Sequence, residues 1–263
     1  MAAQRIDLAH PASWPDRLRE VTTALAAQVE TLLDGTGVHA SELAAVNRSF
    51  AAAAEAQTRA AIGTHLIGAM HATRLLPHEA TSIRRDGLSM LTDEMRDGKL
   101  AAAATAYPHL LDDAGADLLR RSSPLVWQGG GVRRGLLWVV VPFDVEDGDV
   151  SGLTPLMDRW GGEVINWTHH PSDGDRAAGL VEALSAVSRP TLVELGVTVD
   201  QIPEFGCVWW VAVGRLLGLP GAGTEWGLTS AVPGANIGEF VTPDHPRWPA
   251  VIDRDDVGGD PGS

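Results

Sequence analysis

The first candidate for chemistry is the sequence His71-Ala72-Thr73-Arg74, which follows a short apolar run. That run predicts a buried strand over about residues 65–71. His71 and Thr73 would lie on the same face of an extended chain, so both could hydrogen-bond one sugar or amide. Arg74, placed just before a helix, could contact a phosphate through its planar guanidinium. The alternative is a core histidine beside a solvated arginine.

A helix is expected directly after this candidate. Pro77 suits a first helical turn, and Glu79 suits the N-terminal end of a helix because of the helix dipole. Gly87 predicts the C-terminal cap.

The second candidate is "RWGGEVINW", Arg159 to Trp167. Gly161 and Gly162 would allow a ligand to approach the backbone closely, and Trp160 offers a flat surface for a ring. Glu163 could orient a ribose hydroxyl or stabilise positive charge at an anomeric carbon. The alternative is a helix break with Glu163 in solvent.

Further candidates are weaker. Glu194 interrupts the apolar strand "TLVELGV", where it either points at water from an edge strand or serves as a second acid. "WQGGGVRRG" is not a phosphate-binding loop and predicts a hairpin turn, from which Arg133 and Arg134 could face a ligand. His169 and His170 are adjacent, so their side chains diverge, and no metal site is expected.

Composition limits the function classes. The net charge of −14 disfavours broad binding to nucleic acid, although recognition of a nucleic-acid end remains compatible with it. One cysteine excludes an internal disulfide and fits a reducing compartment. No apolar run reaches membrane-spanning length, and the N-terminus lacks a signal-peptide core. We therefore expect a cytoplasmic protein that does not enter membranes.

Hydrophobic periodicity divides the chain into three parts. An amphipathic helix is expected over 14–34, and a second, alanine-rich helix from Ser41 to about 62. A turn at Gly35 and Gly37 would join them into an N-terminal helical element, residues 1–62. Strands and helices without regular alternation follow over 63–252, which favours α+β architecture. Residues 253–263 predict a disordered acidic tail.

These residues together resemble a known family. "HATRLLPHEATSIRRDGL" is similar to the first motif of the ADP-ribosyltransferase-like fold, in which a strand with His and Thr precedes a helix that ends in Gly-Leu. The wider chain resembles a group of uncharacterised bacterial proteins with an H-x-T-R-L segment, a W-G-G-E segment and a strand that begins with Arg-Pro. The matching positions lie between about 65 and 200: His71, Thr73, Arg74, Leu75, Glu79, Ile83, Gly87, Leu88, Trp160 to Glu163, and Arg189 to Val193.

The resemblance implies a split antiparallel sheet that binds NAD as a substrate and needs no metal. It implies that His71 hydrogen-bonds the adenosine-side ribose or the nicotinamide-side backbone, with Thr73 in support. Arg74 would then lie near the pyrophosphate, and Trp160, Gly161 and Gly162 would contact NAD. Glu163, or else Glu194, would be the catalytic acid, with His71 as a further catalytic candidate. The family's usual second-motif tyrosine or serine is not evident, so Trp138 or Trp160 would supply the stacking ring.

The function that the resemblance implies is an NAD-dependent ADP-ribosyltransferase, in the manner of a toxin or a defence effector. The acceptor would be a protein, a nucleic-acid end or a small molecule. The chain would also have an antitoxin or another protein as a partner. The alternatives are an NAD hydrolase on the same fold and a non-catalytic module that binds a nucleotide or ADP-ribose.

Overall fold

The computed structural model describes residues 5–8, 10–36, 47–123, 134–141, 157–165, 174–203, 207–219 and 224–248. The predicted tail, 253–263, lies outside these residues. So do His169, His170 and Arg133.

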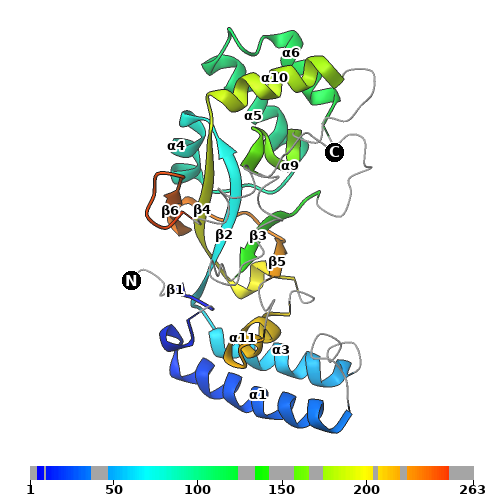
Figure 1. Ribbon diagram of the computed structural model, residues 1–263, viewed down its shortest axis with the longest axis vertical. Coiled ribbons are helices and arrows are strands. Elements are labelled where there is room, and N and C mark those ends of the chain that lie inside the picture. The colour runs from blue at the N-terminus through cyan, green and yellow to red at the C-terminus, as the bar shows by residue number, and fades with distance from the viewer. Residues whose placement is uncertain are drawn as a thin grey trace, which may run out of the picture. The chain divides into compact units, whose positions relative to one another are not determined.

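Six strands form one open sheet, in the order β5-β3-β2-β4-β6, with β1 beside β2 (Figure 1). The strands are β1 (Arg5–Ile6), β2 (Leu66–Leu75), β3 (Leu137–Val141), β4 (Arg189–Val197), β5 (Thr224–Leu228) and β6 (Ile237–Val241). β4 and β6 pair antiparallel, whereas β1 and β2 pair parallel. The predicted class, α+β with helices around a largely antiparallel sheet, is confirmed.

The chain divides into two compact units. The first unit comprises Met1–Ala69, Val140–Gly148 and Gly196–Trp226. The second unit comprises Met70–Val139, Asp149–Leu195 and Gly227–Ser263. The first segment of the first unit ends close to the boundary predicted at residue 62, but this unit also takes in two later segments.

The first unit is built on three helices, α1 (Asp16–Thr36), α3 (Arg48–Ile62) and α11 (Val208–Leu216). α1 and α3 lie side by side and both contact α11 (Figure 1). Their shared core consists of Leu25, Ala26, Val29, Ala54, Trp209 and Val213. The two predicted helices are therefore present and packed together.

The ends of these two helices differ from the prediction. α1 continues through Gly35 to Thr36, because a glycine weakens a helix without forbidding it. α3 begins after Asn47, whose side chain accepts a hydrogen bond from the backbone N–H of Phe50. Ser41, the expected start of this helix, lies outside the described residues.

The second unit surrounds its strands with α4 (Pro77–Asp86), α5 (Asp93–Ala106), α6 (Asp113–Arg121), α9 (Gly162–Ile165) and α10 (Gly174–Ala186). Its core joins α5, α6, α10 and the turn before α9, with Leu100, Leu111, Leu119, Trp160 and Leu184 fully buried. This core holds in place the elements that surround the cavity described below.

Gly87 caps α4, as predicted, and its conformation explains why glycine is needed there. Its φ is 92°, a region that side chains strongly disfavour. A β-carbon at Gly87 would also lie only 2.0 Å from the carbonyl oxygen of Val232. The chain then turns into a bridge between Leu88 and Val232.

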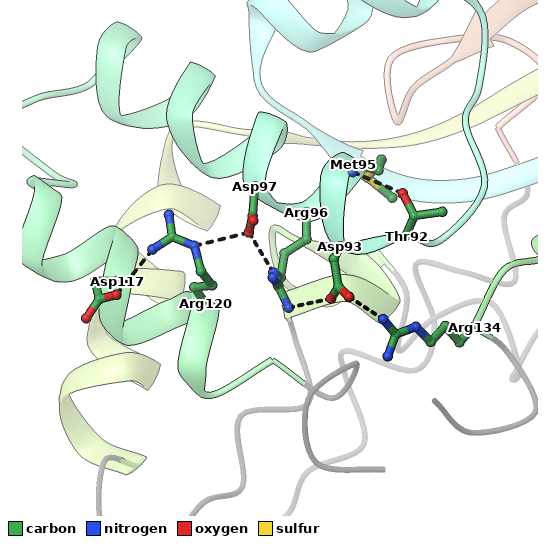
Figure 2. A network of polar contacts seen from close by, with 8 residues as sticks. All are labelled: Thr92, Asp93, Met95, Arg96, Asp97, Asp117, Arg120 and Arg134. Atoms are coloured by element: carbon green, nitrogen blue, oxygen red, sulfur yellow. Dashed lines mark hydrogen bonds and ion pairs between the residues drawn. The ribbon is translucent and has the colours of Figure 1, made fainter. Parts of the chain in front are cut away.

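A network of ion pairs fixes α5 (Figure 2). Arg96, whose side chain is only 6% exposed, contacts Asp93 at 2.9 Å and Asp97 at 2.9 Å. Arg120 of α6 contacts Asp97 at 3.1 Å, and Arg134 contacts Asp93. α5 is thus tied both to α6 and to the turn before β3.

Candidate functional site

A cavity of about 280 Å³ lies within the second unit. Its walls come from β2, β3, α4, residues 87–91, α5 and the Gly161-Gly162 turn. Most of the lining side chains are apolar, including Leu75, Ile83, Leu91, Met95 and Leu137. The polar side chains that line it are His71, Thr73, His78, Glu79, Ser82, Ser89 and Lys99. An apolar cavity with a few convergent polar groups is typical of a small-molecule site, and this volume is near the lower end of the usual range.

His71 lies within β2 and lines this cavity. The strand was predicted to end at about residue 71, but β2 runs on to Leu75, so His71 stands inside the strand. Its Nδ1 lies 2.8 Å from the carbonyl oxygen of Trp138 on β3. A carbonyl only accepts, so Nδ1 carries the proton and Nε2 is left as an acceptor. Burial lowers the pKa of His71, and the nearby Lys99 lowers it further, so the ring is neutral at pH 7.

Thr73, Gly161 and Gly162 also line the cavity, and their contact with NAD stays a prediction. Thr73 is two residues beyond His71 on the strand, and both side chains reach the same cavity. Gly161 and Gly162 have φ values of 108° and 52°. A β-carbon on Gly161 would lie 2.5 Å from that of Ile165, so this turn requires glycine.

Glu79 is the described carboxylate that lines the cavity, and three donors hold it. Oε2 accepts hydrogen bonds from the backbone N–H of Leu76 at 2.7 Å and from Nε1 of Trp160 at 3.0 Å. Oε1 pairs with Nζ of Lys99. A carboxylate with these partners has both oxygens engaged and holds its neighbours in place.

Trp160 has a different place from the one predicted. It was expected to stack on a ligand ring, but it is fully buried and lies behind Glu79. Its ring faces Lys99, whose Nζ lies 5.0 Å from the ring centroid. Trp160 therefore acts on the cavity through Glu79 and Lys99.

Arg74 was expected near a pyrophosphate, but the structure directs it away from the cavity. Its guanidinium donates to the carbonyl oxygen of Ser185 at 2.9 Å and 3.1 Å, and to Oγ of Ser188 at 2.9 Å. It also donates to the carbonyl oxygen of Met157 at 3.2 Å. These contacts join β2 to the C-terminal end of α10. The reason is strand alternation, which sends Arg74 to the face opposite His71 and Thr73.

The candidate acids are not brought together. Glu163 lies in α9 next to Gly162, which lines the cavity, but its side chain is outside the described part. Glu194 lies on β4, where it pairs with Arg247, and Arg247 also pairs with Glu239 of β6. Glu194 is therefore part of an ion-pair cluster at the β4–β6 edge and does not line the cavity.

Two further positions qualify the sequence predictions. Arg134, which could have faced a ligand, pairs with Asp93 in the network that fixes α5. His78 was not predicted, and it lines the cavity with both ring nitrogens buried and without a hydrogen-bond partner among the described residues.

Lys99 was also missed, because no motif surrounds it. The available signal was its rarity: it is the only lysine of the chain, beside 19 arginines.

The described residues contain no group of three or more His, Cys, Asp and Glu that could hold a metal ion. None of their helices combines the length and the apolar character needed to cross a membrane.

Comparison of the chain with protein-family models, curated protein sequences and solved structures found no match.

Proposed function

We propose that the cavity binds part of NAD and that the chain is an NAD-dependent ADP-ribosyltransferase. The observation that supports the proposal is the placement of His71. Its tautomer is set by Trp138, its Nε2 is left to accept a hydrogen bond, and Thr73 lines the same cavity. The helix α4 and its cap at Gly87 follow as in the family that the sequence resembles.

In this reaction the bond between C1′ of the ribose and the nicotinamide nitrogen breaks, and its electron pair leaves with nicotinamide. The acceptor forms a bond to the oxocarbenium-like C1′ and loses a proton. A carboxylate near C1′ stabilises the developing positive charge. Glu163 is the candidate for this role because it adjoins Gly162 at the cavity. Glu79 is not, because its oxygens already face three donors.

The test is incubation of the purified protein with NAD, with free nicotinamide and ADP-ribose followed by mass spectrometry. Cell lysate is added in a parallel sample as a source of acceptor. The proposal expects nicotinamide release that His71→Ala and Glu163→Gln abolish. His10→Ala is the matched control, because His10 is exposed and pairs with Asp7 at the surface. No release in either sample, from protein with a cooperative melting transition, would overturn the catalytic proposal.

A non-catalytic nucleotide-binding module is the second candidate, and the pairing of Glu79 favours it. The described cavity holds no carboxylate that is free of protein donors. Such a module would bind NAD or ADP-ribose, and the bound nucleotide would raise the melting temperature of the protein. No nicotinamide would be released. This outcome separates the two functions in the same experiment.

A further inference from the structure

Lys99 is the only lysine of the chain, and the other 19 residues of the Lys and Arg set are arginines. Many of these arginines form ion pairs at the surface. Lys99 instead lines the cavity, with its side chain only 14% exposed. Lysine and arginine differ because an ammonium is a compact charge, whereas a guanidinium is a broad planar fork. The cavity therefore has a small cation at one defined point.

The protein fixes the direction of this ammonium. Glu79 binds it through one oxygen, and that carboxylate is itself held by Leu76 and Trp160. The face of Trp160 attracts the same charge. An ammonium has three N–H groups, and Glu79 is its one hydrogen-bond acceptor among the described residues. Donor capacity is therefore left for a ligand in the cavity.

The charges of the cavity favour an uncharged ligand. Lys99 and Glu79 neutralise each other, and His71 is neutral. Among the described lining residues there is no arginine, and Arg74 is engaged with α10. A phosphate would lack the cations that usually bind it. A pyridinium ring would meet an ammonium ion without a spare carboxylate to compensate for the repulsion.

The polar groups specify what the uncharged ligand must carry. Lys99 donates, and Nε2 of His71 accepts. Lys99 and His71 line the same cavity, so one small ligand can reach both groups. A purine nucleoside has ring nitrogens that accept and an exocyclic amine and hydroxyls that donate. Its flat base suits apolar walls, and its size suits a cavity of about 280 Å³.

We propose that Lys99 is the specificity-determining residue of this cavity, and that the cavity takes a neutral nucleoside of the adenosine type. The inference rests on the proposed function only in taking this cavity as the binding site. In a complex with NAD, the adenosine end would enter the cavity, and the pyrophosphate and the nicotinamide riboside would lie outside it, with C1′ within reach of Glu163 as the proposed function requires.

A single lysine allows a direct test. The protein is treated with a limiting amount of an amine-acetylating reagent, and acetylation of Lys99 is followed by mass spectrometry of its peptide. The N-terminal amine is the internal control. Adenosine, nicotinamide riboside and pyrophosphate are compared as probes of the three parts of NAD. We expect adenosine to slow acetylation of Lys99 several-fold, with no effect on the N-terminal amine and none from the other two probes.

Calorimetry with adenosine gives the second measurement. Lys99→Met should weaken binding about tenfold or more, because it removes a charged donor. Lys99→Arg keeps the charge beside Glu79 and should also weaken binding, because the fork does not fit the same point. Arg121→Met is the control for loss of a positive charge, since Arg121 is exposed on α6.

Failure of the adenosine inference can be distinguished from failure of the ADP-ribosyltransferase proposal. Equal or better protection by nicotinamide riboside or pyrophosphate would overturn the inference, as would adenosine that neither protects Lys99 nor binds in calorimetry. Adenosine protection without nicotinamide release from NAD would leave the inference standing and reject only the catalytic function. Nicotinamide release from NAD, without protection of Lys99 by adenosine, would support the catalytic function and reject the inference about Lys99.

Discussion

The hydrogen bond between Nδ1 of His71 and the carbonyl oxygen of Trp138, 2.8 Å long, sets what the cavity offers a ligand. β3 supplies the carbonyl, and β2 carries the histidine. The pairing directs the proton to Nδ1 and leaves Nε2 as an acceptor at the cavity wall. A side-chain to main-chain hydrogen bond between neighbouring strands thus defines the chemistry of the candidate site.

The first prediction concerns stability against pH. The pKa of His71 in the folded protein is below its ordinary value of 6.5, mainly because the ring is buried. The unfolded chain therefore binds more protons between the lowered pKa and about 6.5, so the free energy of unfolding should decrease as pH falls through this window. Urea unfolding at a series of pH values would measure the slope. His71→Gln should reduce the slope.

The affinity for adenosine should also decrease as pH falls. Protonation of His71 at acid pH would convert Nε2 from an acceptor to a donor and place a second cation near Lys99. Adenosine affinity measured by calorimetry should be constant at neutral pH and fall as pH drops through the lowered pKa. An affinity that stayed constant down to the pH of acid unfolding would show that His71 does not contact the ligand.

A second prediction concerns the pair of Glu79 and Lys99, whose side chains are 10% and 14% exposed. Glu79→Gln leaves a largely buried ammonium without its counter-ion, so it should destabilise the protein by about 3 kcal/mol. The double variant Glu79→Gln with Lys99→Met removes both charges and should recover most of this loss. Denaturant unfolding of the four proteins gives the coupling energy. Strictly additive effects would mean that the two groups do not interact.

Local patterns were sufficient to predict several parts of this site. The apolar run and the Pro77, Glu79 and Gly87 signals correctly indicated a strand followed by a capped helix. Strand alternation correctly indicated that His71 and Thr73 share a face. Each of these inferences depends on residues a few positions apart, where the geometry of the chain is constrained by its own backbone.

Long-range partners could not be predicted in this way. Arg74 is held by Ser185, which is 111 positions away, and Trp160 is held by Glu79, 81 positions away. Nothing near Arg74 in the sequence distinguishes a phosphate ligand from an arginine that binds a helix end, because both uses exploit the same donors. Lys99 was missed for a related reason, since its role depends on two residues from other elements.

A third prediction follows from the contacts of Arg74. Arg74→Lys keeps the charge but loses the fork that reaches Ser185, Ser188 and Met157, so it should destabilise the protein by about 1–3 kcal/mol. Its affinity for NAD should be unchanged at a temperature where the variant is folded. Chemical denaturation and calorimetry measure the two effects. A large loss of NAD affinity with unchanged stability would restore the role that the sequence suggested.

The final prediction uses two helical glycines that differ in their surroundings. Gly98 in α5 lines the cavity, whereas Gly179 lies in α10 away from it, and a β-carbon at either position would meet no atom within 4 Å. Alanine loses less backbone entropy than glycine in a helix, so Gly98→Ala and Gly179→Ala should each stabilise the protein by about 0.5–1 kcal/mol. Only Gly98→Ala adds a methyl group to the cavity wall, so only this variant should change adenosine affinity. Thermal unfolding and calorimetry of both variants would separate these effects, and equal affinities would place the ligand away from α5 and from Lys99.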